Sequence, residues 1–284
     1  MIMKLSKYKF LPKLVYLTVI SLTLFVSSCE DVVDVNLKTA PPRLVVDASI
    51  NWEKGTSGAT QKIVLTTTSD YYSAEIPKAS GAVIKVKNSN NTEFIFTEDG
   101  STGIYICPDF EPLIGETYTL SILYKGEIYT ATETMQSVPK IDKIEQKSDG
   151  GILKDQYEVF FYFQDVPNIA NYDLARFLPN YLKVPTFYAS DDRFTDGQES
   201  NWSYSEEDLK PGNTLEFTHY GISRSYYNYM NILINVSGGA SGGGPFQTAP
   251  VSVRGNVVNA TNSDNYALGY FSVSETEKIL YTVQ

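Results

Sequence analysis

The sequence has very few of the side chains that most catalytic and metal sites use. Among its 284 residues there is one histidine, His219, and there are two cysteines, Cys29 and Cys107. A zinc site needs several histidine or cysteine ligands, which these residues cannot supply. We also expect no Gly-x-Ser-x-Gly nucleophile elbow for which His219 could act as the base. The glycine run at residues 242–244 lacks the Gly-Lys-Ser/Thr ending of a phosphate loop. These absences predict a protein that is not an enzyme and that uses no metal or other cofactor.

Basic residues are also scarce, and this limits the partners of the protein. The chain has 23 lysines and arginines against 33 aspartates and glutamates, a net charge of −10. Four of the lysines lie in residues 1–28, which hold no acidic side chain, so 19 basic residues face 33 acidic ones in the remainder. Phosphate contacts need clustered lysine and arginine, so nucleic acid is excluded as a partner. The same deficit disfavours binding of the folded part to anionic lipid.

The apolar run near the N-terminus is too short to cross a membrane. It covers residues 14–27, whereas a spanning helix needs about 20 apolar residues. Lysines precede the run and Val26-Ser27-Ser28 precede Cys29, which is the form of a lipoprotein signal peptide. An N-terminal anchor helix is the alternative. We expect residues 1–28 to be removed and Cys29 to be acylated.

Residues 29–42 have the composition of an extended tether that ends at Pro41-Pro42. Glu30 and Asp31 directly follow Cys29. In this position they resemble the signal by which lipoproteins of the Bacteroidota reach the outer face of the outer membrane. Ordinary solubilising charge is the alternative.

The first globular block, residues 43–138, consists of short runs rich in Val, Ile, Thr, Tyr and Phe that are separated by turn residues. Seven strands at this spacing predict an immunoglobulin- or fibronectin-like sandwich. The runs cover residues 44–50, 62–68, 82–87, 92–97, 104–106, 117–124 and 127–134.

Two side chains of this block have predicted structural roles. Tyr118 begins a strand just after a corner, which is the position of a tyrosine corner; a plain core tyrosine is the alternative. Cys107 ends an apolar run and is expected to be a small buried hydrophobic residue rather than a nucleophile. If Cys29 is acylated, no intramolecular disulfide is possible.

The second block, residues 139–284, is expected to be a β-rich domain, either a sandwich or a partly open barrel, after a hinge near Pro139-Lys140. Strands are predicted at residues 157–164, 171–177, 186–190 and 214–219. One main helix is predicted over residues 222–236, with Ser223 as its N-cap and Gly238 just past its end. Alternation of apolar residues from Met230 onward leaves a strand as the alternative.

Two loops of the second block, residues 191–204 and residues 238–246, are the candidate binding segments, because binding sites are most often on loops. A plain disordered connection is the alternative for the second, which is rich in glycine. Residues 191–197 carry three aspartates but lack the spacing of a calcium loop, so a surface acidic loop is expected rather than a metal site. A group of aromatic side chains could stack on a sugar, a flat cofactor or a partner protein, although strand surfaces and cores use tyrosine as well. The group consists of Trp202, Tyr204, Tyr220, Tyr226, Tyr227 and Tyr229. The candidate ligand- or partner-binding residues are Trp202, Tyr204, Gly242, Gly243, Gly244 and Phe246.

The chain resembles an uncharacterised family of outer-membrane lipoproteins of the Bacteroidota, known only as a domain of unknown function. The resemblance rests on the leader, on residues 157–172, on residues 225–230, and on two C-terminal motifs. These motifs are Pro250-Val251-Ser252-Val253-Arg254-Gly255-Asn256-Val257 and Leu268-Gly269-Tyr270-Phe271-Ser272-Val273-Ser274. Gly255 fits a close backbone approach, and Tyr270-Phe271 fit a strand packed between helix and sheet.

The resemblance implies a TonB-dependent outer-membrane receptor as the partner and implies no catalytic residues. We therefore expect a lipid-anchored protein of the outer membrane, facing the cell exterior, that acts as a binding or accessory subunit of a nutrient receptor. An adhesin- or fimbria-like structural protein is the second hypothesis, and a surface hydrolase is the third. The sequence does not name the nutrient ligand.

Overall fold

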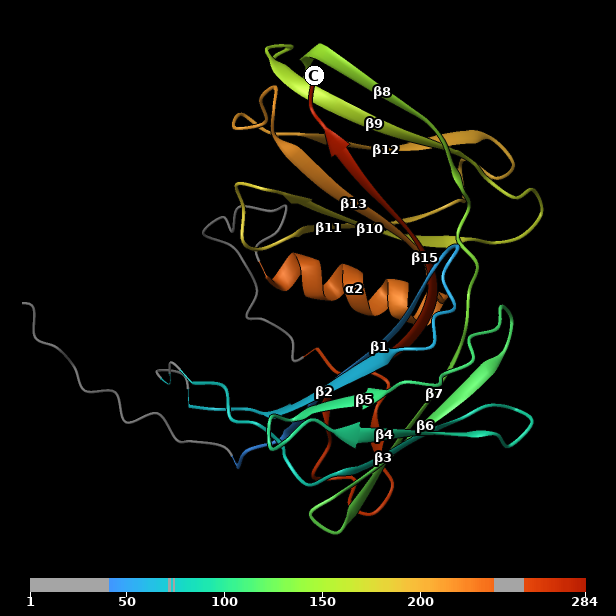
Figure 1. The fold of residues 1–284 in the computed structure, drawn as a ribbon, viewed down its shortest axis with the longest axis vertical. Coiled ribbons are helices and arrows are strands. Elements are labelled where there is room, and N and C mark those ends of the chain that lie inside the picture. Colours follow the sequence, from blue (N-terminus) through green and yellow to red (C-terminus); the bar gives the residue numbers. More distant parts are fainter. Residues whose placement is uncertain (1–40, 71–72, 74, 238–252) are drawn as a thin grey trace, which may run out of the picture. The chain divides into compact units, whose positions relative to one another are not determined.

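A computed structural model describes residues 41–70, 73, 75–237 and 253–284 (Figure 1). Residues Pro41–Gln284 form one compact unit. The described part of the chain is built from β-strands and a single helix, so the predicted mainly-β fold class is confirmed. Strands form a 12-stranded sheet of order β11-β10-β13-β15-β1-β2-β5-β4-β3-β6-β7-β14 and a 3-stranded sheet of order β12-β9-β8.

The seven strands predicted for the first block are all present, with ends within a few residues of the prediction. Apolar side chains alternate with polar ones along each strand, so one face of each is buried. The buried faces of these strands meet in one core, which includes Ile50, Ile84 and Leu120. The strands are β1 (Leu44–Glu53), β2 (Gln61–Thr67), β3 (Val83–Lys87), β4 (Glu93–Glu98), β5 (Ile104–Cys107), β6 (Thr117–Tyr124) and β7 (Glu127–Thr134).

Tyr118 forms the predicted tyrosine corner. Its ring is fully buried, and its hydroxyl donates to the carbonyl of Glu111 at 2.7 Å. The same oxygen accepts from the main-chain N–H of Leu113 at 3.0 Å. The loop before β6 is therefore tied to the strand that follows it.

The second block contributes a second two-layer core. Strands β9, β8 and β12 pack against the β10-β13-β15 part of the large sheet, with Phe161, Phe177 and Phe217 between the layers. The Phe161 and Phe217 ring centroids are 4.2 Å apart. The elements are β8 (Ile141–Gly150), β9 (Gln156–Gln164), β10 (Tyr172–Pro179), β11 (Thr186–Asp191), β12 (Glu199–Ser205), β13 (Thr214–Gly221), α2 (Arg224–Val236), β14 (Val258–Asn259) and β15 (Leu268–Thr282).

The long strand β15 belongs to both blocks (Figure 1). Its first part pairs with β1 in parallel, from Leu268 to Thr276, and its last part pairs with β13 in antiparallel fashion, from Thr276 to Thr282. Phe271 and Val273 complete the core of the first block. The boundary predicted after Val138 falls between β7 and β8, and its hinge stays a prediction.

The predicted helix is confirmed at Arg224–Val236, and the strand alternative is wrong there. The Ser223 side chain caps it by accepting from the N–H of Tyr226. One side of α2 packs on Leu174 through Met230. Tyr226 and Tyr229 both stack near Tyr270 of β15, with centroids 4.8 Å away. Tyr270 therefore packs against the helix, as predicted. The same prediction is wrong for Phe271, because alternation along β15 turns this side chain into the core of the first block.

The C-terminal motifs place two chain segments in very close contact. A Cβ at Gly255 would collide with the carbonyl oxygen of Gly269, and a Cβ at Gly269 would collide with that of Val46. Gly269 also has a φ of +87°, a region that favours glycine. The close approach expected at Gly255 is confirmed.

Among the described residues, no helix is both long and apolar enough to cross a membrane.

Candidate functional site

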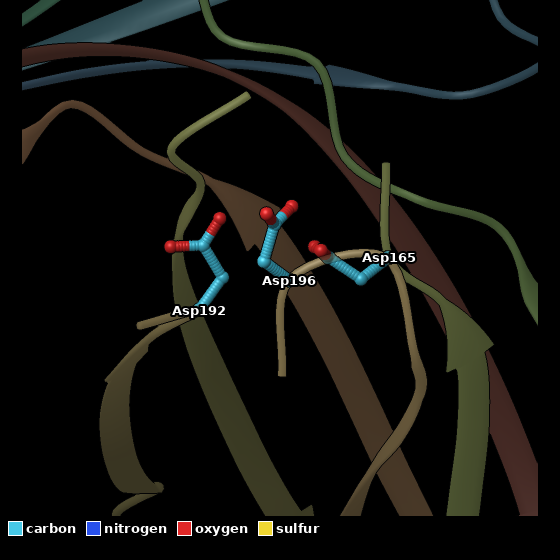
Figure 2. Close-up of side chains that lie close together, drawn as sticks. All are labelled: Asp165, Asp192 and Asp196. Carbon is cyan, nitrogen blue, oxygen red and sulfur yellow. The ribbon is translucent and has the colours of Figure 1, made fainter. Parts of the chain in front are cut away.

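Three aspartates from separate parts of the second block lie close together (Figure 2). Asp165 directly follows β9, Asp192 follows β11, and Asp196 is in the loop that leads to β12. One carboxylate oxygen of each lies within 4.8 Å of the others, and Asp165 and Asp192 are buried. Of the three aspartates noted in residues 191–197 of the sequence, only Asp192 and Asp196 belong to this cluster. Asp191 is instead paired with Arg193 at 2.8 Å, and this hydrogen bond keeps its pKa below the usual value.

The three carboxylates brace the surrounding loops. Asp165 accepts from the N–H of Gly197 at 2.7 Å and from the side-chain amide of Asn171 at 2.9 Å. Asp192 accepts from the N–H of Asn171 at 2.8 Å, and Asp196 accepts from that of Asn168 at 2.8 Å. These hydrogen bonds give each aspartate a structural role that needs no ion.

Oxygen ligands at this spacing are also the kind that a calcium ion prefers. A cavity of about 40 Å³ lies beside the cluster and is lined by Asp165, Asp192, Asp173 and Trp202 among others. It is large enough for a water molecule or an ion. Because the loop hydrogen bonds explain the cluster by themselves, we assign the three aspartates a structural role. Asp192 is buried, so the expectation of a surface acidic loop is wrong at this residue.

His219 is sealed inside the second core. It is fully buried, its Nε2 lies 3.0 Å from Asp173 Oδ1, and its Nδ1 has no hydrogen-bond partner in the described part of the chain. The rings of Phe163 and Trp202 cover it. A catalytic histidine must lie within hydrogen-bonding distance of the proton that it transfers. Among the described residues, no hydroxyl or thiol nucleophile is hydrogen-bonded to His219.

Cys107 is buried as predicted. Burial raises the pKa of its thiol to about 11, and the Sγ lies 3.2 Å from Asp109 Oδ1. The thiolate, which is the nucleophilic form, is therefore scarce at neutral pH.

The predicted aromatic anchors are in a strand and not in a loop. Trp202 and Tyr204 belong to β12, so that part of the loop prediction is wrong. Tyr204 is 2% exposed and packs on Phe177 at 5.2 Å, while Trp202 is partly buried against the second core. Alternation of apolar and polar residues from Asn201 to Ser205 was the signal for a strand.

The glycine-rich candidates Gly242, Gly243, Gly244 and Phe246 lie outside the described residues. Residues 239–243 read Gly-Ala-Ser-Gly-Gly, so the expectation that the chain lacks the Gly-x-Ser-x-Gly letters is wrong. A nucleophile elbow joins a strand to a helix. This segment instead follows helix α2, so the pattern lacks the context of an elbow.

A larger cavity opens where the two blocks share the sheet. Its volume is about 300 Å³, and two of its lining residues, Tyr220 and Tyr226, belong to the group of aromatic residues that the sequence offered for stacking on a ligand or partner. The signal that could have found it is the row of polar residues Asp47, Ser49 and Asn51, which alternate with the buried residues of β1. The cavity is lined by Asp47, Ser49, Asn51, Lys62, Val64, Leu174, Arg176, Phe187, Tyr220 and Tyr226.

Several solved structures share a weak likeness with this chain. A segment of two fibronectin type III domains from chicken tenascin is 13% identical, covers 63% of this chain and 90% of that chain, and has a TM-score of 0.21. A cytokine receptor complex is 9% identical, with coverage of 64% and 86% and a TM-score of 0.26. The FN1–FN3 domains of chicken CNTN1 are 13% identical, with coverage of 64% and 62% and a TM-score of 0.25. Scores this low carry no argument about function.

No curated protein matches the sequence. A family model described as a domain of unknown function matches residues 30–279, nearly the whole described part. This chain therefore belongs to the family of the domain of unknown function DUF4249.

Proposed function

We propose that this protein is a lipid-anchored component of the outer membrane, exposed at the cell surface, and a binding or accessory subunit of a TonB-dependent nutrient receptor. The anchor would be Cys29, which follows a basic stretch, an apolar run and small residues. The acidic residues Glu30 and Asp31 behind it support the surface location. The receptor partnership is supported by the resemblance of the leader and C-terminal motifs to Bacteroidota lipoproteins.

A binding role is favoured over turnover by the cavity of about 300 Å³ between the two blocks. Small-ligand pockets have volumes of about 300–1,000 Å³ and combine apolar walls with a few polar groups. This cavity combines both kinds of wall, and neither the buried His219 nor the buried Cys107 lines it. It is the single observation that carries the proposed binding function.

The anchor is tested by replacing Cys29. Labelling cells with palmitate should mark the wild type, and Cys29→Ser should remove the label and release the protein from membranes or leave an unprocessed precursor. Cys107→Ser is the matched control, because that thiol is buried and should not affect labelling. Palmitate labelling that persists in Cys29→Ser would overturn the lipid anchor.

The partnership is tested by affinity purification of the tagged protein from outer membranes, followed by mass spectrometry. A TonB-dependent receptor should be enriched relative to a purification of an unrelated tagged outer-membrane lipoprotein. Enrichment of fimbrial subunits in place of a receptor would favour a structural adhesin instead. Surface exposure is checked by protease treatment of intact cells, which should degrade the protein.

A further inference from the structure

We propose that the cavity of about 300 Å³ between β1–β2 and β10–β13 is a saccharide-binding site. This inference rests on the proposed binding function and names the chemical class of the ligand. Three features support it, namely the face of the sheet that lines the cavity, the polar groups on that face, and the aromatic rings beside them.

The lining residues share one face of the large sheet. Strand register places Ser49 opposite Ser272, and Asn51 opposite Ser274. On the other edge of β15, Tyr220 lies opposite Thr276. Residues directly opposite each other in a sheet point to the same face. The lining residues of β1 and Tyr220 of β13 therefore lie on the same face of the sheet, on either side of β15.

The same face continues to the edge of the sheet. Leu174 lies opposite Tyr220, and Phe187 lies opposite Arg176, two residues along from Leu174. Helix α2 covers this face near Leu174, and Tyr226 projects from it to the cavity wall. The cavity is therefore the part of this face that α2 leaves open.

The part of this face that lines the cavity is polar along β1. Asp47, Ser49 and Asn51 line the cavity, and Asp47 and Asn51 are exposed. Ser272 and Ser274, which lie opposite Ser49 and Asn51 in β15, are 3% and 1% exposed and do not line it. The carboxylate, hydroxyl and amide groups of the β1 row are suited to a ligand that exchanges hydrogen bonds with them.

The charges on this face are few and of both signs. Asp47 and Lys62 lie on neighbouring strands of the same face, and neither belongs to a salt bridge in the described ranges. Arg176 is already paired with Glu216. A phosphate site needs clustered positive charge, and a calcium site needs several carboxylates. The cavity has neither, so a neutral polar ligand fits it best.

The aromatic walls specify the class of neutral ligand. Phe187, Tyr220 and Tyr226 line one side of the cavity. A sugar ring packs its C–H face on an aromatic ring, while its hydroxyls bond to planar polar side chains such as Asp47 and Asn51. The cavity volume is at the lower end of the range for small-ligand pockets, about 300–1,000 Å³. It suits one or two sugar rings.

The test uses the detergent-solubilised mature protein and a panel of neutral sugars. Glucose, galactose, mannose, maltose and lactose are each titrated by calorimetry and by saturation-transfer NMR. We expect at least one of them to bind with saturation. The paired variant Asn51→Ala and Lys62→Gln should weaken that binding at least about fivefold, because the first removes an amide and the second replaces a charged donor by a weaker neutral one.

The variants are chosen to leave the fold intact. Asn51 bonds to the Gln61 side chain through its main chain only, by its N–H at 3.1 Å and its carbonyl at 3.0 Å, so Asn51→Ala keeps both bonds. Lys62 is exposed. The paired control Lys140→Gln and Asp142→Asn changes two exposed residues outside the cavity and should leave binding unchanged.

Three results would overturn the proposal. These are no binding of any sugar by folded protein, binding that the cavity variant does not weaken, and saturable binding of glycine or dialanine in place of sugars. Failure here is separable from failure of the proposed function, because receptor co-purification is measured without any sugar. A protein that enriches the receptor and binds no sugar keeps the function and loses the saccharide site.

Discussion

The side chain of Asn256 makes two hydrogen bonds with the main chain of Phe271. Its Nδ2 donates to the Phe271 carbonyl at 2.8 Å, and its Oδ1 accepts from the Phe271 N–H at 2.9 Å. The amide of one side chain thus replaces the strand that would otherwise pair with β15 at this point. Gly255, just before it, lets the segment come close enough to Gly269 for this pairing.

Replacing Asn256 tests the pairing. Asn256→Ala should lower the free energy of unfolding by about 1–3 kcal/mol, because it leaves the Phe271 main-chain groups without their partner. Urea denaturation followed by tyrosine fluorescence measures it. Asn90→Ala, at an exposed turn, is the control and should change stability little. Equal stabilities of the two variants would show that the pairing contributes nothing.

Gly269 should be one of the least replaceable residues of the fold. Gly269→Ala is expected to cost about 4 kcal/mol or more, because the new Cβ would collide with the Val46 carbonyl in addition to the strain of a positive φ. Gly55 has a φ of +80°, and a Cβ added there would meet no atom within 4 Å, so Gly55→Ala reports the strain alone. Thermal unfolding of both variants compares them. Similar melting temperatures would mean that the close approach to Val46 is relaxed in solution.

The tyrosine corner can be measured by removing one hydroxyl. Tyr118→Phe should destabilise the protein by about 1–3 kcal/mol, because the hydroxyl bonds both to Glu111 and to Leu113. Tyr188→Phe is the matched control, since its ring is 39% exposed and its hydroxyl has no hydrogen bond within the described residues. Chemical denaturation of both gives the difference. A loss in Tyr118→Phe no larger than in the control would contradict the corner.

Asp165 should hold the loops of the acidic cluster in place. Asp165→Asn is expected to lower the free energy of unfolding by about 1–3 kcal/mol. One of the two carboxylate oxygens becomes an NH₂ group, so the side chain can no longer accept from both Gly197 and Asn171. Limited proteolysis should then cut residues 192–198 faster than in wild type. Asp155→Asn, at an exposed position, is the control. Unchanged cleavage of that loop would show that the brace is unimportant.

Glu133 should make stability depend on pH. Burial raises the pKa of its carboxyl above the usual value of 4.5, and its Oε2 accepts from the hydroxyls of Ser223 and Tyr270. The folded state therefore binds a proton more tightly than the unfolded state does. This contribution to stability is complete below about pH 4.5 and is lost as the pH rises through the folded pKa.

The variant Glu133→Gln should remove that loss, because glutamine accepts the same hydrogen bonds without taking up charge. Melting temperatures from pH 4 to pH 8 measure it, with the exposed Glu207→Gln as control. Relative to wild type, Glu133→Gln should gain stability as the pH rises. A constant difference across this range would contradict the raised pKa.

Most of the first block could be predicted because its signals are local. The alternation in residues 117–124 and the corner at Tyr118 depend on neighbours within a few positions, as does the cap at Ser223. Strand β8 escapes prediction because its sequence, with Lys143, Glu145 and Lys147, is largely polar and half exposed. Strand β12 escapes prediction because its alternation covers only residues 201–205 and its polar residues are typical of a loop.

The candidate sites could not be predicted because their residues are distant in sequence. Asp165 lies near Asp192 only because β9 and β11 end near each other. Asn51 and Tyr220 line the same cavity only because β1 and β13 both pair with β15. Strand order and register are properties of the whole sheet. Local alternation predicts which face of a strand a residue occupies. The strand order and register of the folded sheet determine which residues of other strands lie next to it.

The shared strand β15 also sets an order of events during synthesis. Phe271 and Val273 complete the core that Leu44 and Ile50 begin, and they are made long after β7 has left the ribosome. The first sandwich therefore cannot close until β15 has been made, and its edge at β1 stays unpaired until then. A premature stop codon or a protease cut before β15 should therefore disable both halves of the protein at once.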